Sequence, residues 1–268
     1  GKVEAEDRFG FEEIVYLLLT GKLPTEDELA EFTTLLSDNR ALPENFFEDM
    51  ILKAPSRDIM NKMARSTLAL YSYDSAPESL SAEHEIDTAV SLIAKMPVIM
   101  ICAYETKRRF FSEESMIMHP LMKGQSTAEN ILSTLRPDRK FTHDEAKLLD
   151  LMLMLHAEHG GGNNSTFSCR VLTSSGTDPY SAYAAAIGSL KGARHGGANH
   201  KVVELHEMIK ANVNNWEDEN ELADYLRKRL KKEAGDGSGL IYGMGHAIYT
   251  LSDPRAVILK EYAGNMAI

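Results

Sequence analysis

The stretch AKLLDLMLMLHAEHGGGNNSTFSC, residues 146–169, is an apolar run that ends in two histidines and then passes into three glycines. Its side chains recur at helical spacing, at Leu148, Leu149, Met152, Leu155 and His156. Just ahead of it, Thr142 and Glu145 have the spacing of a capping box, in which each side chain pairs with the other residue's backbone N–H. This pattern predicts a helix that begins after Thr142 and ends near His159.

Helix-start signals recur on both sides of this stretch. They are the pairs Thr25 with Glu28 and Ser126 with Glu129, and Asp178 followed by Pro179. A charge-rich segment at about 216–232 predicts a solvated amphipathic helix, and GDGSG at 235–239 is the clearest flexible break. No sustained alternation typical of strands is found, so the predicted fold class is all-α.

The amino-acid composition of the chain argues against several classes of protein. The 268 residues are 43% apolar and carry a formal charge of −11, which argues against a nucleic-acid or anionic-membrane surface. Only Cys102 and Cys169 are present, too few for a disulfide framework, which favours a cytoplasmic location. The most apolar stretch, 89–104, is short and interrupted by Lys95 and Pro97, so it predicts a buried helix rather than a membrane span.

Three histidines stand beside glycine at breaks between predicted helices: His159, His195 and His246. Glycine lets a ligand come close to the backbone and to the imidazole. Arg255 follows His246 in the sequence and supplies a cation. Together these residues indicate a site for an anionic ligand that bears a carbonyl group, although each histidine taken alone is typical of a helix cap or a core residue.

Other interpretations of the glycine-rich stretch stay open. His156 and His159 share a helix face, as metal ligands do, but the H-E-x-x-H order and a third ligand are missing, and we expect no metal. His156 is then either a packing residue or one that supports a neighbouring substrate contact. Asn163, Asn164 and Ser165 either contact a ligand or satisfy backbone groups in the loop.

The segments at 156–202, which includes HAEHGGGNNSTFSCRV and GARHGGANHKV, and at 239–256, GLIYGMGHAIYTLSDPRA, resemble the citrate synthase family in a bacterial form. The resemblance runs through most of the chain. It implies an almost wholly helical, two-domain homodimer, with a large domain over 1–195 and part of a small domain over 196–268. It also implies condensation of acetyl-CoA with oxaloacetate, as in the tricarboxylic acid cycle, followed by thioester hydrolysis, with no cofactor.

The resemblance also implies roles for individual residues. His159 matches the histidine that holds oxaloacetate, and Arg255 an arginine on the substrate carboxylate. His195 matches the histidine that hydrogen-bonds the acetyl thioester oxygen, and His246 the one that polarises the ketone. Asn163 and Ser165 are candidate substrate contacts, and Ser165 is the best candidate to orient His195. The backbone of the CoA-binding loop is expected at Ile241, Tyr242, Gly243, Met244 and Gly245.

Two alternatives remain. One is a 2-methylcitrate synthase that accepts propionyl-CoA, because one methylene changes binding by only about 1–3 kcal/mol. The other is a catalytically incomplete, truncated homologue that serves as a scaffold or binder. The family's general base is an aspartate after the region that matches Arg255, where this sequence offers no acidic residue beyond Glu261. Asp253 is better interpreted as a turn or helix cap than as a substitute base.

Overall fold

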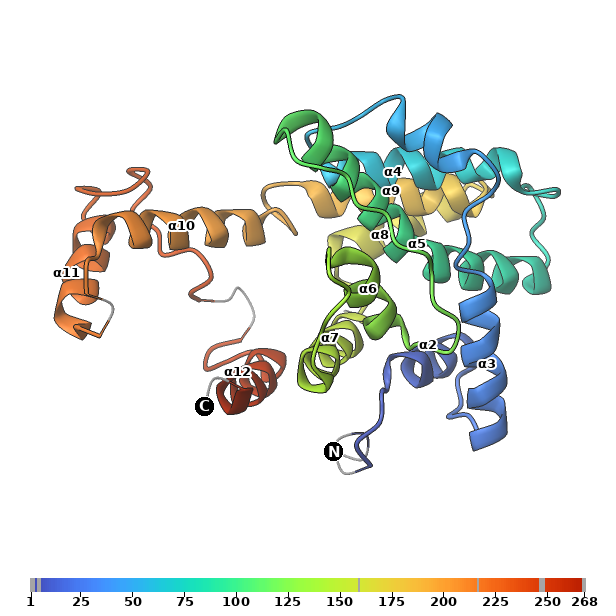
Figure 1. Cartoon of the computed structure of the whole chain (residues 1–268), viewed down its shortest axis with the longest axis horizontal. Coiled ribbons are helices and arrows are strands. Elements are labelled where there is room, and N and C mark those ends of the chain that lie inside the picture. Colours follow the sequence, from blue (N-terminus) through green and yellow to red (C-terminus); the bar gives the residue numbers. More distant parts are fainter. Residues whose placement is uncertain (1–2, 4–5, 159, 216, 246–248, 267–268) are drawn as a thin grey trace. The chain divides into compact units, whose positions relative to one another are not determined.

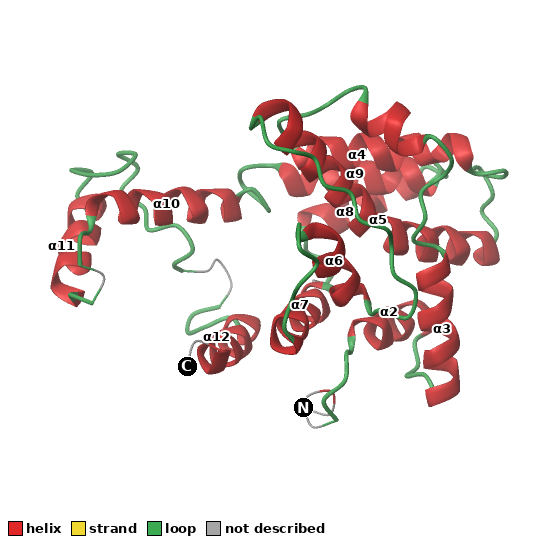
Figure 2. Cartoon of the chain, in the orientation of Figure 1, coloured by secondary structure: helices red, strands yellow, loops and turns green. Residues whose placement is uncertain are grey.

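The computed structural model describes residues 3, 6–158, 160–215, 217–245 and 249–266. Every regular element among these residues is a helix, which confirms the all-α fold class (Figure 2). The chain divides into two compact units, Gly1–Ser189 with Pro254–Ile268, and Leu190–Asp253. The predicted domain boundary at residue 195 stays a prediction.

The first unit contains most of the helices, and Figure 1 labels them along the chain. They are α2 (Phe11–Thr20), α3 (Glu26–Asp38), the π-helix η1 (Phe47–Leu52), α4 (Ile59–Leu70), the 3-10 turn η2 (Tyr71–Tyr73), α5 (Ala82–Phe111), α6 (Thr127–Leu135), α7 (His143–His156), α8 (Asn164–Thr173), α9 (Pro179–Lys191), which runs into the second unit, and α12 (Pro254–Met266). The second unit holds α10 (Ala198–Asn212) and α11 (Glu219–Leu230).

Helices α3, α6, α7 and α9 begin at the capping residues that the sequence predicts. Thr25 donates its backbone N–H to Glu28 Oε2 at 2.8 Å and accepts the Glu28 N–H at 3.2 Å, a complete capping box at α3. The same box forms at the starts of α6 and α7. Asp178 Oδ1 accepts the Ser181 N–H at 2.8 Å, and Pro179 follows it as the first residue of α9. These hydrogen bonds confirm the predicted caps. The sequence could predict them because each cap depends on residues only three positions apart.

The long helix α5 forms the centre of the first unit. It packs against α3, α4, α6 and η1, and it continues through Pro97. Its apolar side chains join two core clusters, one around Phe46 and Ile99 and one around Phe32 and Val90. Of the described helices, α5 alone is long and apolar enough to cross a membrane, and half of its most apolar window is buried. The prediction of a buried helix over 89–104 is thus confirmed.

Two helices of the first unit begin on carboxylates from distant parts of the chain. Asp150 of α7 accepts the N–H groups of Gly10 and Phe11 at 2.8 and 3.1 Å, at the start of α2. Glu12 of α2 accepts the Thr127 N–H at 2.7 Å, at the start of α6. Both carboxylates are buried. They therefore tie α7 to α2 and α2 to α6 through groups that would otherwise be buried without partners.

Burial raises the pKa of Asp150 to about 6, although the hydrogen bonds from Gly10 and Phe11 act to lower it. Because this pKa lies above that of the unfolded chain, the carboxyl contributes its full stability below about pH 4 and loses it as pH rises through about 6. A pKa raised to about 6 in the folded protein corresponds to roughly 3 kcal/mol of stability at most. Asp150→Asn has no such titration.

We expect urea unfolding between about pH 4 and 7 to show the wild-type protein losing stability relative to Asp150→Asn as pH rises. The comparison with the variant removes the opposite contributions of carboxylates such as Glu28 and Glu145, whose pKa values are lowered to about 2. If the unfolding free energy of the wild type minus that of Asp150→Asn stays constant or rises with pH, the assignment is contradicted.

Candidate active site

Two of the predicted site histidines, His159 and His246, lie outside the described residues. Their roles stay predictions. The other predicted residues fall in both compact units: Asn163, Ser165 and Arg255 in the first, and His195 with the loop 241–245 in the second.

The glycine-rich stretch after α7 leads directly into α8. His156, the last residue of α7, pairs through Nδ1 with the Met152 carbonyl at 2.7 Å. Gly160 has a positive φ of 70°. Asn163 Oδ1 accepts the N–H groups of Ser165 and Thr166 at 2.8 and 3.2 Å, which makes it the N-cap of α8. Of the two interpretations of Asn163, the structure therefore shows the one that satisfies backbone groups, and a contact with substrate stays a prediction.

Arg255 is the second residue of α12, and its side chain is partly buried. Helix α12 packs against α7, the helix that ends at the glycine-rich stretch (Figure 1). The structure thus brings Arg255 into the same compact unit as Asn163 and Ser165, although the sequence separates them by about 90 residues.

His195 lies in a tight turn that leads into α10. Its backbone N–H donates to the Gly192 carbonyl at 2.9 Å, and the Gly197 N–H donates to the same oxygen at 3.1 Å. A Cβ added to Gly196 would lie 2.6 Å from the Leu190 carbonyl oxygen. The turn closes so tightly that a side chain at Gly196 or Gly197 would clash with backbone atoms, and it holds His195 just ahead of the helix N-terminus, as the sequence predicts.

The predicted CoA-binding loop lies against the same helix. Gly243 and Gly245 have φ values of 85° and 87°, and the Met244 N–H donates to the Ile241 carbonyl at 3.3 Å. A Cβ added to Gly243 would lie 3.1 Å from the side chain of Val202, in the N-terminal half of α10. The His195 turn therefore precedes the helix whose N-terminal half the loop 241–245 lies against, although about 45 residues separate them in the sequence.

No group of three His, Cys, Asp or Glu side chains within the described ranges is arranged to hold a metal ion. The pair His156 and His159 is not covered by this observation, because His159 is outside those ranges.

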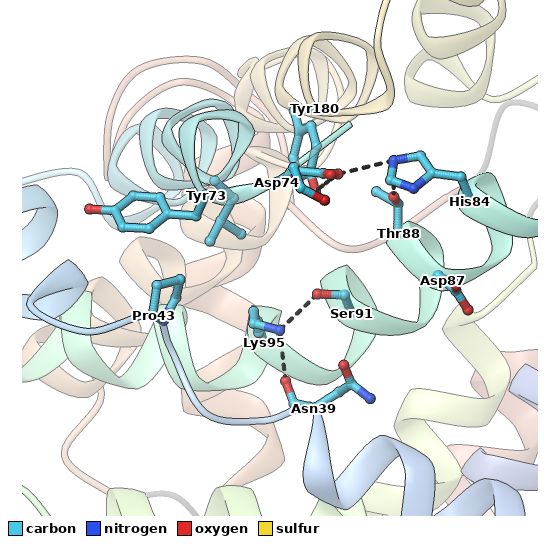
Figure 3. Close-up of a pocket in the computed structure, with 12 residues that line it drawn as sticks. Asn39, Pro43, Tyr73, Asp74, His84, Asp87, Thr88, Ser91, Lys95 and Tyr180 are labelled. Atoms are coloured by element: carbon cyan, nitrogen blue, oxygen red, sulfur yellow. Dashed lines mark hydrogen bonds and ion pairs between the residues drawn. The ribbon is translucent and has the colours of Figure 1, made fainter. Parts of the chain in front are cut away.

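A cavity of about 340 Å³ on the first unit was not anticipated from the sequence (Figure 3). Asp74 Oδ2 accepts the Tyr180 hydroxyl at 2.7 Å and lies 3.1 Å from His84 Nε2. On the facing wall, Lys95 Nζ donates to the Asn39 carbonyl at 3.0 Å, and burial lowers the pKa of Lys95. The lining comes from separate elements, so no local pattern could have indicated it, and it contains none of the predicted site residues.

A family model described as citrate synthase, C-terminal domain, matches residues 3–268. The chain belongs to the citrate synthase family. It is 36% identical to the citrate synthase of Acidithiobacillus ferridurans over 263 residues, and 33% identical to the 2-methylcitrate synthase of Shewanella oneidensis over 260 residues. Each alignment covers 96% of this chain and 63% of the relative.

Solved structures agree with this membership. The crystal structure of citrate synthase from Pyrobaculum aerophilum matches with a TM-score of 0.77 and 26% identity, over 99% of this chain and 63% of that one. The family resemblance and its helical fold are thereby confirmed. The chain spans less than two thirds of the length of these citrate synthase relatives.

The tightness of the His195 turn can be tested with two glycine-to-alanine variants. In Gly197→Ala the new Cβ would lie 2.8 Å from the Ala193 Cα, so we expect a loss of about 1–3 kcal/mol in unfolding free energy. Gly188→Ala in α9 is the matched control, since nothing lies within 4 Å of its Cβ. It should gain up to about 1 kcal/mol from helix propensity. Equal effects of the two variants in urea unfolding would show that the turn differs from this description.

Proposed function

We propose that the protein to which this chain belongs is a citrate synthase. It condenses acetyl-CoA with oxaloacetate and then hydrolyses the thioester to citrate and CoA. Family membership supports this function, and one geometric observation carries it: the turn that holds His195 leads into α10, and the loop 241–245 lies against the N-terminal half of the same helix. The resemblance assigns this histidine to the thioester and this loop to CoA, so an acyl-CoA bound along that part of α10 would reach both.

In this proposal His195 donates a hydrogen bond to the thioester oxygen, where charge develops as the methyl group loses its proton. The proton goes to a carboxylate base, which the resemblance places C-terminal to Arg255. A donor aimed at the enolate oxygen lowers the barrier more than it strengthens substrate binding. The N-terminus of α10 directly after His195 adds positive potential at the same place.

The enolate then attacks the ketone of oxaloacetate, which forms a carbon–carbon bond and an alkoxide. His246 is proposed to donate to that oxygen, and Arg255 to hold a carboxylate of the substrate, for which the planar guanidinium is suited. His159, Asn163 and Ser165 complete the proposed oxaloacetate contacts. Water finally cleaves the citryl thioester and releases CoA. No further cofactor enters this scheme.

We also propose a cytoplasmic homodimer that serves the tricarboxylic acid cycle. An exposed apolar face on α8 supports the dimer: Phe167 and Val171 are 62% and 49% exposed, and none of the residues of α8 is buried. Met152 of α7 adds to the exposed apolar surface of the same unit. Such surface is typical of helices that are covered by a second subunit.

The role of His195 can be tested in the full-length protein. We expect His195→Ala to lower kcat by about 100-fold or more while oxaloacetate binding, measured by calorimetry, changes little. His200→Ala is the control, because His200 lies five residues further on, is 78% exposed and only approaches Glu204 at 3.3 Å. Near-normal turnover of His195→Ala would reject the assignment.

The choice of thioester needs its own measurement, because relatives of both names match at similar identity. We expect kcat/KM for acetyl-CoA to exceed that for propionyl-CoA by about tenfold or more. A reversed preference would make the protein a 2-methylcitrate synthase. A protein that binds oxaloacetate and CoA but turns over neither thioester would instead be the catalytically incomplete homologue.

A further inference from the structure

The second unit contains a fully buried arginine. Arg229 lies in the last turn of α11, and its side chain is 0% exposed. The sequence predicts this helix as a solvated one, and its neighbour Arg227 is indeed 67% exposed. Burying an arginine is costly unless its N–H groups find partners within the fold. The partners of Arg229 therefore show what the burial achieves.

Apart from Met208 Sδ of α10, which lies 3.4 Å from Nη1, the partners of the guanidinium belong to the segment just ahead of, or within, the proposed CoA-binding loop. Arg229 Nε donates to the Leu240 carbonyl at 2.7 Å, and Nη2 pairs with Asp236 Oδ1 at 3.0 Å. The guanidinium also lies over the ring of Tyr242, 5.3 Å from its centroid. The Arg229 side chain thus contacts three residues of the segment 236–242.

Asp236, the carboxylate that pairs with Arg229, also accepts hydrogen bonds from the same segment. Its Oδ2 accepts the Tyr242 hydroxyl at 2.9 Å, and its Oδ1 accepts the Ser238 N–H at 3.1 Å. The hydrogen bonds from Ser238 and Tyr242, with the charge of Arg229 beside them, hold the pKa of this carboxyl well below its usual range. Asp236 is therefore an anion that links Arg229 to the hydroxyl end of Tyr242.

Gly235 shows how closely the loop wraps the guanidinium. Its φ is +71°, and a Cβ at this position would lie 2.0 Å from Arg229 Nη1. The stretch 235–239, expected as a flexible break, is instead folded around a buried cation. Ile241 and Tyr242 then pack against the core of the second unit, while Met244 is 76% exposed.

We propose that Arg229, Asp236 and Tyr242 form a positioning cluster that holds the loop 241–245 in the conformation that binds acyl-CoA. This rests on the proposed function. Because Arg229 is fully buried, it acts in this proposal through the Leu240 carbonyl, Asp236 and Tyr242 rather than by contact with CoA. Binding orders a loop at a cost in entropy, and a loop already held in place avoids most of that cost, so the cluster raises affinity for the thioester.

The test uses Asp236→Asn and Tyr242→Phe in the full-length protein. Asp236→Asn removes the charge that pairs with Arg229 and the acceptor that faces the Tyr242 hydroxyl, and Tyr242→Phe removes that hydroxyl. Both variants keep the shape of the side chain. We expect the KM for acyl-CoA to rise about five- to tenfold, with kcat and the KM for oxaloacetate within about twofold of wild type. Without ligand, amide hydrogen exchange at 240–245 should become faster, while α10 and α11 keep their protection.

Two further variants sharpen the experiment. Arg227→Met is the matched control, because Arg227 lies on the same helix, is 67% exposed and pairs with exposed Asp224; neither KM nor exchange should change. The double variant Asp236→Asn with Tyr242→Phe should raise the KM for acyl-CoA no further than the larger single effect, since both disrupt the same hydrogen bond between Asp236 and Tyr242.

Unchanged exchange at 240–245 in both single variants would overturn the proposal, and so would faster exchange with an unchanged KM for acyl-CoA. If the wild-type protein binds no CoA at all, the proposed function fails. In that case the exchange comparison still decides whether the cluster holds the loop, so the two failures are distinguishable.

Discussion

A chain folded into helices has to satisfy the N–H groups that every helix leaves unpaired at its N-terminus. In the first unit two buried carboxylates meet this requirement across long stretches of sequence, Asp150 for α2 and Glu12 for α6. Because each bond joins segments more than 100 residues apart, it fixes the relative placement of the helices as well as their ends. Helix α7, held in this way, leads into the stretch where substrate contacts are proposed.

In the second unit, buried polar groups are satisfied by a cation instead of a carboxylate. Arg229 satisfies a loop carbonyl and a carboxylate from inside the fold, and the glycine at 235 leaves room for it. Helix α10 then connects the two proposed functions of this unit, because the His195 turn precedes it and Gly243 rests on its side. A rigid helix that carries the histidine turn at its start and the loop on its side favours a constant distance between the two, which the proposed catalysis on a thioester requires.

Much of this could be predicted from the sequence. The capping boxes could be predicted because Thr25 and Glu28 are only three residues apart. The family could be predicted because its motifs are contiguous in the sequence around His195 and Arg255. The roles of Asp150 and Arg229 could not be predicted. Asp150 sits in an apolar run whose partner lies 140 residues away, and Arg229 stands among exposed charges that resemble it in every local respect. Their roles depend on tertiary partners that no local pattern specifies.

The two-unit division has a consequence for synthesis of the chain. The first unit is completed by α12 packing on α7, yet all of Leu190–Asp253 lies between these helices in the sequence. A ribosome adding roughly 5–20 residues per second needs about 5–20 s to pass from the end of one helix to the start of the other. During that interval the surface of α7 that α12 will cover is open to other chains. A chaperone that shields nascent helices would therefore matter most in that window.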